Sequence, residues 1–243
     1  MRARLDIELV ARGLAISREQ AKRLILAGAV RVNGQLARKA SDTVTADADV
    51  QIAAGEKFVS RGGPKLEAAL GAFQIDPTGK LCVDIGASTG GFTDCLLQHG
   101  ARHVHAVDVG KGQLAWKLRQ DARVTVHDGV NARNILPTQI GEPADLVTID
   151  ASFISLTKIL PAVVTLLRPG GQLVALIKPQ FEAGRADVGK GGVVRDAVVH
   201  ARVQAEVIDF STGTLGLQLV GQCESPLLGP AGNKEFLVGF SKP

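Results

Sequence analysis

From Leu81 onward, short apolar runs alternate with segments in which apolar residues recur every three or four positions. Short apolar runs are typical of strands buried on both faces, and the wider spacing is typical of amphipathic helices. The alternation predicts an α/β domain with a mostly parallel sheet and helices on both faces. A Pro/Gly-rich loop between the last two strands predicts a hairpin that adds an antiparallel strand. The predicted strands are 81–85, 103–108, 123–127, 145–150, 172–178, 217–223 and 234–240, and the predicted helices lie near 91–99, 112–119, 155–167 and 196–210.

The first 53 residues follow a different pattern, in which short amphipathic segments precede short strands. Ser17-Arg18-Glu19-Gln20 is a capping-box pattern that opens a helix, and Asn33-Gly34 is a strong hairpin signal. We predict helices over 5–13 and 17–28, a hairpin over 30–37 and one edge strand over 43–52. We therefore predict a small domain over residues 1–56 and a larger one over 57–243, joined by a short linker near 53–58. Pro64 suits the first turn of a helix that opens the larger domain.

Charge is spread unevenly along the 243 residues, which are 45% hydrophobic. Residues 1–40 hold nine basic and three acidic side chains, a net charge of +6, so the remainder of this +4 chain carries −2. A basic module favours a polyanionic partner, although a solvated basic face would give the same composition. The chain has neither an apolar run of membrane-spanning length nor a signal-peptide pattern at its start, so we expect a cytoplasmic protein. Three scattered cysteines lack metal-ligand spacing and are expected to be buried thiols, so no metal is expected.

The most informative segment is Val83–Phe92, which reads as a strand, a glycine-rich turn and the start of a helix. Its glycines depart from the dinucleotide G-x-G-x-x-G order, and the chain has no P-loop, so neither NAD nor a nucleoside triphosphate is indicated. Acids also end the next two predicted strands, although each acid could instead cap the following helix. Asp108 lies 22 residues after Gly86, close to the spacing of a ribose-binding acid. We predict S-adenosylmethionine as the cofactor, with contacts from Asp84, Gly86, Ser88, Thr89, Gly90, Gly91, Phe92, Asp108 and Asp128.

The segment after the fourth predicted strand bears on the acceptor group. It reads Asp150-Ala151-Ser152-Phe153, without the prolines of the N/D-P-P-Y/F motif found in amino-group methyltransferases. No cysteine follows a proline, as a cytosine-C5 enzyme would need, so a hydroxyl acceptor remains. Lys178 ends an apolar run and is a candidate base or alkoxide stabiliser. Lys65 at a helix start and Glu235 before the last strand are further candidates, with ordinary surface roles as the alternative.

Residues 4–6, 17–21 and 25–34 resemble the S4 RNA-binding domain. In that family, paired helices and a hairpin loop dock on structured RNA through contacts of the kind that position a protein on phosphates. The resemblance implies that the small domain binds RNA. The candidate RNA contacts are Arg4, Arg18, Lys22, Arg23, Arg31 and, beyond the linker, Arg61.

Five further segments resemble the TlyA (hemolysin A) family of FtsJ-like ribose methyltransferases: 60–66, 84–93, 150–156, 178–182 and 232–236. The resemblance implies a Rossmann-like class I methyltransferase sheet and a catalytic set of Lys65, Asp150, Lys178 and Glu235. Lys178 would act as base or alkoxide stabiliser, Asp150 would orient it, and the other two would hold the nucleotide ribose. The family transfers methyl groups from S-adenosylmethionine to cytidine 2′-OH groups in ribosomal RNA.

The partners implied by this resemblance are ribosomal RNA or ribosomal subunits, with neither DNA nor membrane, and the oligomeric state stays open. The chain length is similar to that of the shorter family type, which implies large-subunit 23S rRNA rather than both subunits. Three alternatives remain at this point: an RNA-binding protein without catalysis, a base methyltransferase and a membrane-lytic hemolysin.

Overall fold

The computed structural model describes residues 2–52 and 57–243, which form two compact units, Met1–Lys57 and Phe58–Pro243. Residues 53–56 of the expected linker lie outside the described residues. Within the described ranges, no helix is both long and apolar enough to cross a membrane.

The first unit packs two helices, α1 (Leu5–Ala11) and α2 (Arg18–Leu26), on short strands around buried Leu5, Leu9, Ile25 and Val30. Half of the predicted capping box is present: Ser17 Oγ accepts from the Gln20 backbone N–H at 3.2 Å, whereas Gln20 Oε1 accepts from the backbone N–H of Ile16, at 2.7 Å, rather than from that of Ser17. One prediction is wrong: residues 43–52 form two strands in two sheets, because the chain turns between them. Strands β1 (Arg2–Arg4) and β4 (Thr43–Thr45) pair, while β2 (Val30–Val32) lies between β3 (Gln35–Leu36) and β5 (Val50–Ile52).

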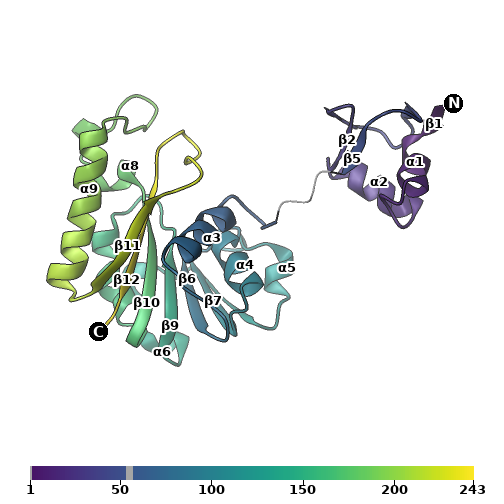
Figure 1. The fold of residues 1–243 in the computed structure, drawn as a ribbon. Helices are drawn as coiled ribbons and strands as arrows, with labels where there is room; N and C mark the ends of the chain where they lie inside the picture. Colours follow the sequence, from purple (N-terminus) through teal and green to yellow (C-terminus); the bar gives the residue numbers. More distant parts are fainter. Residues whose placement is uncertain (1, 53–56) are drawn as a thin grey trace. The chain divides into compact units, whose positions relative to one another are not determined.

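The second unit is built on a seven-stranded sheet in the order β11-β12-β10-β9-β6-β7-β8 (Figure 1). From β8 to β10 neighbouring strands are parallel, and β12 is antiparallel to both of its neighbours, as the last two apolar runs predicted. The strands are β6 (Leu81–Ile85), β7 (His103–Asp108), β8 (Val124–Asp128), β9 (Ala144–Ile149), β10 (Leu167–Ile177), β11 (Gln218–Glu224) and β12 (Phe236–Ser241).

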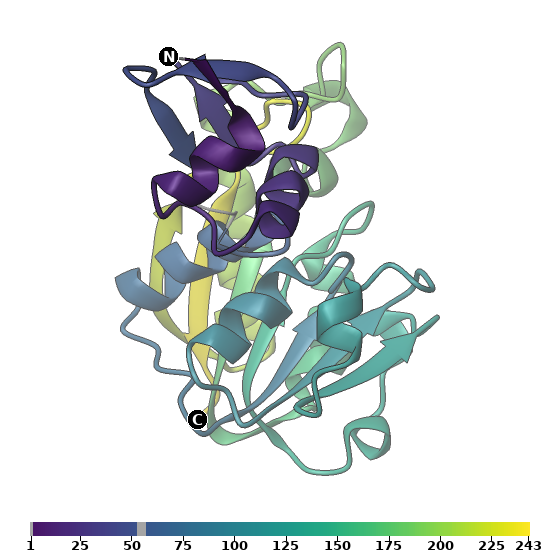
Figure 2. The ribbon, with the colours of Figure 1, turned by 90° about the vertical axis from the view of Figure 1, so that its right-hand side faces the viewer.

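Helices cover both faces of this sheet. On one face, α3 (Gly62–Ala72), α4 (Gly91–Gln98) and α5 (Trp116–Arg119) bury apolar side chains against Cys82 and Val104. These helices lie in front of the strands in Figure 2. On the other face, α7 (Leu160–Val164) and α9 (Ala197–Asp209) pack on Val83 and Val147. Shorter segments are α6 (Pro137–Ile140), α8 (Pro179–Glu182), 3₁₀ turns at Ala132–Asn134, Leu156–Lys158 and Arg185–Asp187, and a π turn at Phe210–Thr214.

Two predicted helices are shorter than their apolar spacing suggested. Residues 112–119 contain only the single turn α5. Residues 155–167 divide into a 3₁₀ turn and α7, which begins afresh with Pro161 in its first turn. A proline there has no backbone N–H to donate to the preceding turn, so it favours a new helix start.

Candidate active site

The carboxyl ends of the central parallel strands bring the predicted catalytic residues together. Asp150 directly follows β9, and Lys178 directly follows its parallel neighbour β10. Lys178 Nζ lies 2.6 Å from Asp150 Oδ1 and donates a hydrogen bond of 2.8 Å to Ser152 Oγ. Lys178 is only 9% exposed, so these partners largely take the place of water around its amino group.

A second buried ion pair joins Lys65 in the first turn of α3 to Glu235, with 2.5 Å between Nζ and Oε2. An ammonium at a helix N-terminus is electrostatically unfavourable, and the Glu235 carboxylate offsets this. Glu235 Oε1 is buried without a hydrogen-bond partner among the described residues. Because β12 pairs with β10 in the register Ile177 to Phe236, Glu235 and Lys178 are the next residues at the same end of the sheet.

A cavity of about 450 Å³ lies over these strand ends, within the size range of small-molecule sites. Four predicted site residues line it, namely Gly86, Ser88, Asp108 and Asp150. Apolar side chains such as Ile85, Val107 and Val130 form much of the remaining wall. The cavity therefore joins a predicted cofactor acid to the Lys178–Asp150 pair.

Asp108 has the hydrogen-bonding capacity that a ribose would need. Its two oxygens accept from the backbone N–H groups of Ser88, at 2.8 Å, and Gly110, at 2.7 Å. A carboxylate oxygen has a second lone pair, so both oxygens can still accept from hydroxyls in the cavity. The wall thus fits a ligand with a sugar diol and an apolar body.

The predicted acid Asp84 is placed differently. It is fully buried, and its Oδ2 accepts from Thr93 N–H at 2.9 Å and Thr93 Oγ–H at 2.7 Å. Burial raises the pKa of Asp84 to about 7. The carboxyl therefore anchors the first turn of α4 and is not among the residues lining the cavity.

The turn residues Thr89, Gly90, Gly91 and Phe92 also lie outside the cavity lining. A Cβ on Gly90, where φ is +100°, would come within 2.3 Å of Leu118, and one on Gly91 would come within 2.3 Å of Ser60 Oγ. Phe92 is 3% exposed. Gly90, Gly91 and Phe92 therefore let α4 pack closely against its neighbours.

Asp128 accepts from Arg119 Nη2 at 2.7 Å and from the Gly112 backbone N–H at 3.1 Å. The Arg119 guanidinium holds the pKa of Asp128 below its usual range. Asp128 does not line the cavity, whereas Asn131 and Ala132, a few residues further along the chain, do. The sequence pattern pointed only to the acid at the strand end, so Asn131 and Ala132 were not predicted.

Other lining residues missed by the sequence are Val109, Gln113 and the loop residues Ala151 to Ile154. Phe153 in this loop has φ +64°, which is unusual for a residue with a Cβ, and is 90% exposed. Its ring centroid lies 5.1 Å from that of Phe181. A strained, exposed aromatic ring beside a cavity is a candidate ligand contact. Its signal in the sequence was only the aromatic residue after the strand end.

The predicted RNA contacts of the first unit fall into two groups. Arg4 and Arg18 both bind the fully buried Asp6, at 3.0 and 2.9 Å, and mainly the Arg4 hydrogen bond lowers the Asp6 pKa to about 2. Lys22 and Arg23 are exposed and have no ion-pair partner in the described part of the chain. Arg31 Nη1 donates to Gly34 O at 3.1 Å beside the hairpin turn.

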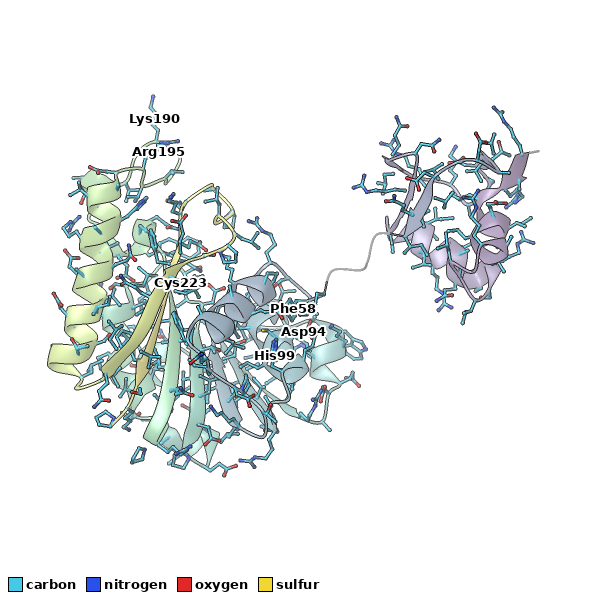
Figure 3. All side chains as sticks on the ribbon, in the orientation of Figure 1. Phe58, Asp94, His99, Lys190, Arg195 and Cys223 are labelled. Atoms are coloured by element: carbon cyan, nitrogen blue, oxygen red, sulfur yellow. The ribbon has the colours of Figure 1, made fainter. Side chains whose placement is uncertain are left out.

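Arg61, the predicted RNA contact of the second unit, donates to Leu228 O at 2.5 Å and so holds the loop that precedes Glu235. Nearby, Asp94 on α4 (labelled in Figure 3) fixes the start of this unit. Its Oδ2 accepts from the Val59 backbone N–H at 2.8 Å and from Lys117 Nζ at 3.0 Å.

This sheet order, with a cavity over the parallel strand ends and an acid at the end of β7, defines a methyltransferase of Rossmann-like fold. Solved methyltransferases share the fold, for example NodS of Bradyrhizobium japonicum in complex with S-adenosyl-l-homocysteine, at 18% identity and a TM-score of 0.51 over 74% of this chain and 89% of that chain. The model of the FtsJ-like methyltransferases matches residues 58–242, and that of the S4 domain matches residues 3–50.

Curated relatives narrow this class. The chain is 50% identical to YqxC of Bacillus subtilis, described as a candidate rRNA methyltransferase, over 99% of this chain and 86% of the relative. It is 49% identical to the 16S/23S rRNA (cytidine-2′-O)-methyltransferase TlyA of Mycobacterium tuberculosis, over 98% of this chain and 89% of the relative. The 23S rRNA (cytidine-2′-O)-methyltransferase TlyA of Campylobacter jejuni is 35% identical to this chain, over 77% of this chain and 72% of the relative.

A solved structure from Streptococcus thermophilus, titled as a candidate hemolysin, superposes with a TM-score of 0.76 at 44% identity, over 99% of this chain and 88% of that chain. The chain therefore belongs to the TlyA family of FtsJ-like methyltransferases.

Proposed function

We propose that this protein transfers the methyl group of S-adenosylmethionine to the 2′-OH of a cytidine in ribosomal RNA, with 23S rRNA as a substrate. The observation that carries the proposal is the ion pair of the buried Lys178 with Asp150 at the edge of the cavity, at 2.6 Å. We assign RNA binding to residues 1–56 and methyl transfer to residues 57–243, in a protein that works in the cytoplasm, where ribosomal subunits are found.

The cavity fits the cofactor in size and chemistry. Asp108 would accept hydrogen bonds from the ribose hydroxyls, and the backbone at Gly86 and Ser88 would lie along the cofactor. Asn131 and Ala132, rather than Asp128, line the wall at the end of β8 and would face the adenine. When bound, the cofactor supplies an electrophilic methyl group.

The two ion pairs would act on the acceptor ribose. Lys178 Nζ would take up the proton of the 2′-hydroxyl as negative charge develops on the oxygen, and Asp150 would hold Nζ in place. Glu235 Oε1 is buried and has no hydrogen-bond partner in the described part of the chain, so it could accept from a ribose hydroxyl. Lys65 would hold Glu235 in place.

Two surfaces support RNA as the substrate. The Phe153–Phe181 pair offers a nucleobase a stacking surface beside the cavity. Lys22 and Arg23 offer phosphates two exposed cations on the S4 unit. The TlyA names from Mycobacterium tuberculosis and Campylobacter jejuni both include 23S rRNA and a cytidine 2′-O product, and the Mycobacterium tuberculosis name also includes 16S rRNA. Large-subunit RNA is therefore the substrate on which these relatives agree.

The test is transfer of labelled methyl groups from S-adenosylmethionine to purified 50S and 30S subunits that lack the modification. Label in 23S rRNA supports the proposal, and label in 16S rRNA as well would extend it to both subunits. Cofactor binding without label in either RNA would contradict it and would favour a different acceptor.

A further inference from the structure

A half-buried acid close to the proposed active site, Glu182 at the end of α8, has no part in the chemistry described above. Its two carboxylate oxygens accept from two donors of one loop. Ser155 Oγ donates to Oε2 at 2.6 Å, and the Leu156 backbone N–H donates to Oε1 at 2.8 Å. Burial raises the pKa of Glu182, so the two donors, which act in the opposite direction, offset only part of the hydration that the carboxylate has lost.

The loop that Glu182 holds runs from Asp150 to Leu156 and supplies much of one wall of the cavity. Lys178 binds Asp150 and Ser152 at the N-terminal end of the loop, and Glu182 binds Ser155 and Leu156 at its C-terminal end. Both residues belong to the short segment Lys178–Glu182, so one segment fixes both ends.

Between these two anchors the loop adopts a conformation that it would not adopt alone. Phe153 has φ +64° and exposes 90% of its surface, so neither backbone preference nor burial of the ring favours this state. Strained positions persist where the surrounding structure imposes them. Here the imposing contacts are the anchors at either end and the ring of Phe181, one residue before Glu182.

We propose that Glu182 is a positioning residue for the acceptor nucleotide: by holding Ser155 and Leu156 it fixes the loop in which Phe153 stands exposed beside the cavity. The proposal rests on the proposed function, because the nucleotide is the ligand that Phe153 would meet. Glu182 itself touches neither acceptor nor cofactor.

The test compares Glu182→Ala with Glu182→Gln and with a control, Glu142→Ala, which removes an exposed acid paired with Arg102 at 3.0 Å. Hydrogen exchange of the 151–156 segment should rise in Glu182→Ala alone, since the Leu156 amide loses its acceptor. The kcat/KM for rRNA should fall by about tenfold or more, as expected for losing hydrogen bonds to a charged group. Glu182→Gln should recover much of this, because its amide can accept from Leu156 N–H and donate to Ser155 Oγ.

A double-mutant cycle separates positioning from general destabilisation. If Glu182 acts through Phe153, the double variant Glu182→Ala/Phe153→Ala should be little worse than the poorer single variant. Effects that multiply, or unchanged exchange in the 151–156 segment, would overturn the proposal. Should Glu182→Ala fail to fold, Ser155→Ala removes one of the two hydrogen bonds and takes its place in the cycle. A wild-type protein that methylates no RNA would contradict both the proposed function and the role of Glu182 in positioning the acceptor nucleotide. The hydrogen-exchange data would still decide whether Glu182 fixes the loop.

Discussion

Replacing Lys178 by methionine tests the site most severely, because it removes the ammonium and keeps the length and apolar stem of the side chain. Lys178 Nζ contacts both Asp150 Oδ1, at 2.6 Å, and Ser152 Oγ, at 2.8 Å. A positioned proton-transfer group contributes about 10²–10⁴-fold in rate, which equals roughly 3–5 kcal/mol of activation free energy. We expect kcat to fall within this range, while the affinity for S-adenosylmethionine changes little, since Lys178 does not line the cavity.

Stability should change less than activity. Breaking a fully buried ion pair costs about 3–5 kcal/mol, but the Asp150 side chain is 23% exposed and water can partly solvate it. The matched control is Lys80→Met, which removes a lysine bound to Gln172 Oε1 at 2.9 Å, on the segment that leads into β6. The assay is single-turnover methyl transfer to 50S subunits, with thermal unfolding measured in parallel. A Lys178→Met protein that is folded and keeps kcat within threefold of wild type would refute the assignment.

Four more outcomes follow from the structure. Asp108→Ala should weaken S-adenosylmethionine binding about tenfold or more in calorimetry, because hydrogen bonds to a carboxylate are lost. An unchanged affinity would contradict a contact between Asp108 and the ribose. Gly91→Ala should lower the unfolding free energy by roughly 1–3 kcal/mol through overpacking, whereas Gly71→Ala, in a helix with nothing within 4 Å of the added Cβ, should be neutral or stabilising; equal effects would contradict the packing argument. Burial lowers the pKa of His105 to about 4, so between about pH 6.5 and pH 4 the unfolded chain binds more protons than the folded protein. As the pH is lowered through this range, the unfolding free energy of the wild type should decrease more steeply than that of His105→Gln. Lys22→Ala should weaken RNA binding and lower the salt slope by about 1 without changing cofactor affinity, and a change in cofactor affinity would speak against a phosphate contact.

Most strands of the large unit could be predicted from the sequence, because parallel strands buried on both faces form continuous apolar runs. The start of β10 could not, since its first residues, Leu167 to Gly171, include a proline and two glycines, and the register with β9 shifts there. The extents of α5 and α7 were also wrong, because apolar spacing records which side chains are buried and not where a helix is interrupted. The single strand predicted over 43–52 failed for a similar reason, since a short polar turn divides it.

Within the candidate site, residues at strand ends and in the glycine turn were predictable, whereas most residues on the other loops were not. Asp108, Asp150 and Lys178 follow apolar runs, and the sheet brings strand ends to one edge. The cofactor contacts of the glycine turn stay a prediction, and the structure adds a packing role for Gly91, at the contact of α4 with the Ser60–Gly63 segment. Phe153 and Glu182 depend on backbone strain and on contacts across the fold, and neither leaves a periodic signal in the sequence.

The central claim is that the acceptor is a ribose hydroxyl of cytidine, and the methylated nucleoside tests it most directly. After reaction with 50S subunits, the 23S rRNA is digested to nucleosides and analysed by mass spectrometry, with alkaline hydrolysis of the intact RNA in parallel. We expect 2′-O-methylcytidine and one phosphodiester bond that resists alkali. A cytosine methylated on its base, with every bond cleaved by alkali, would contradict it.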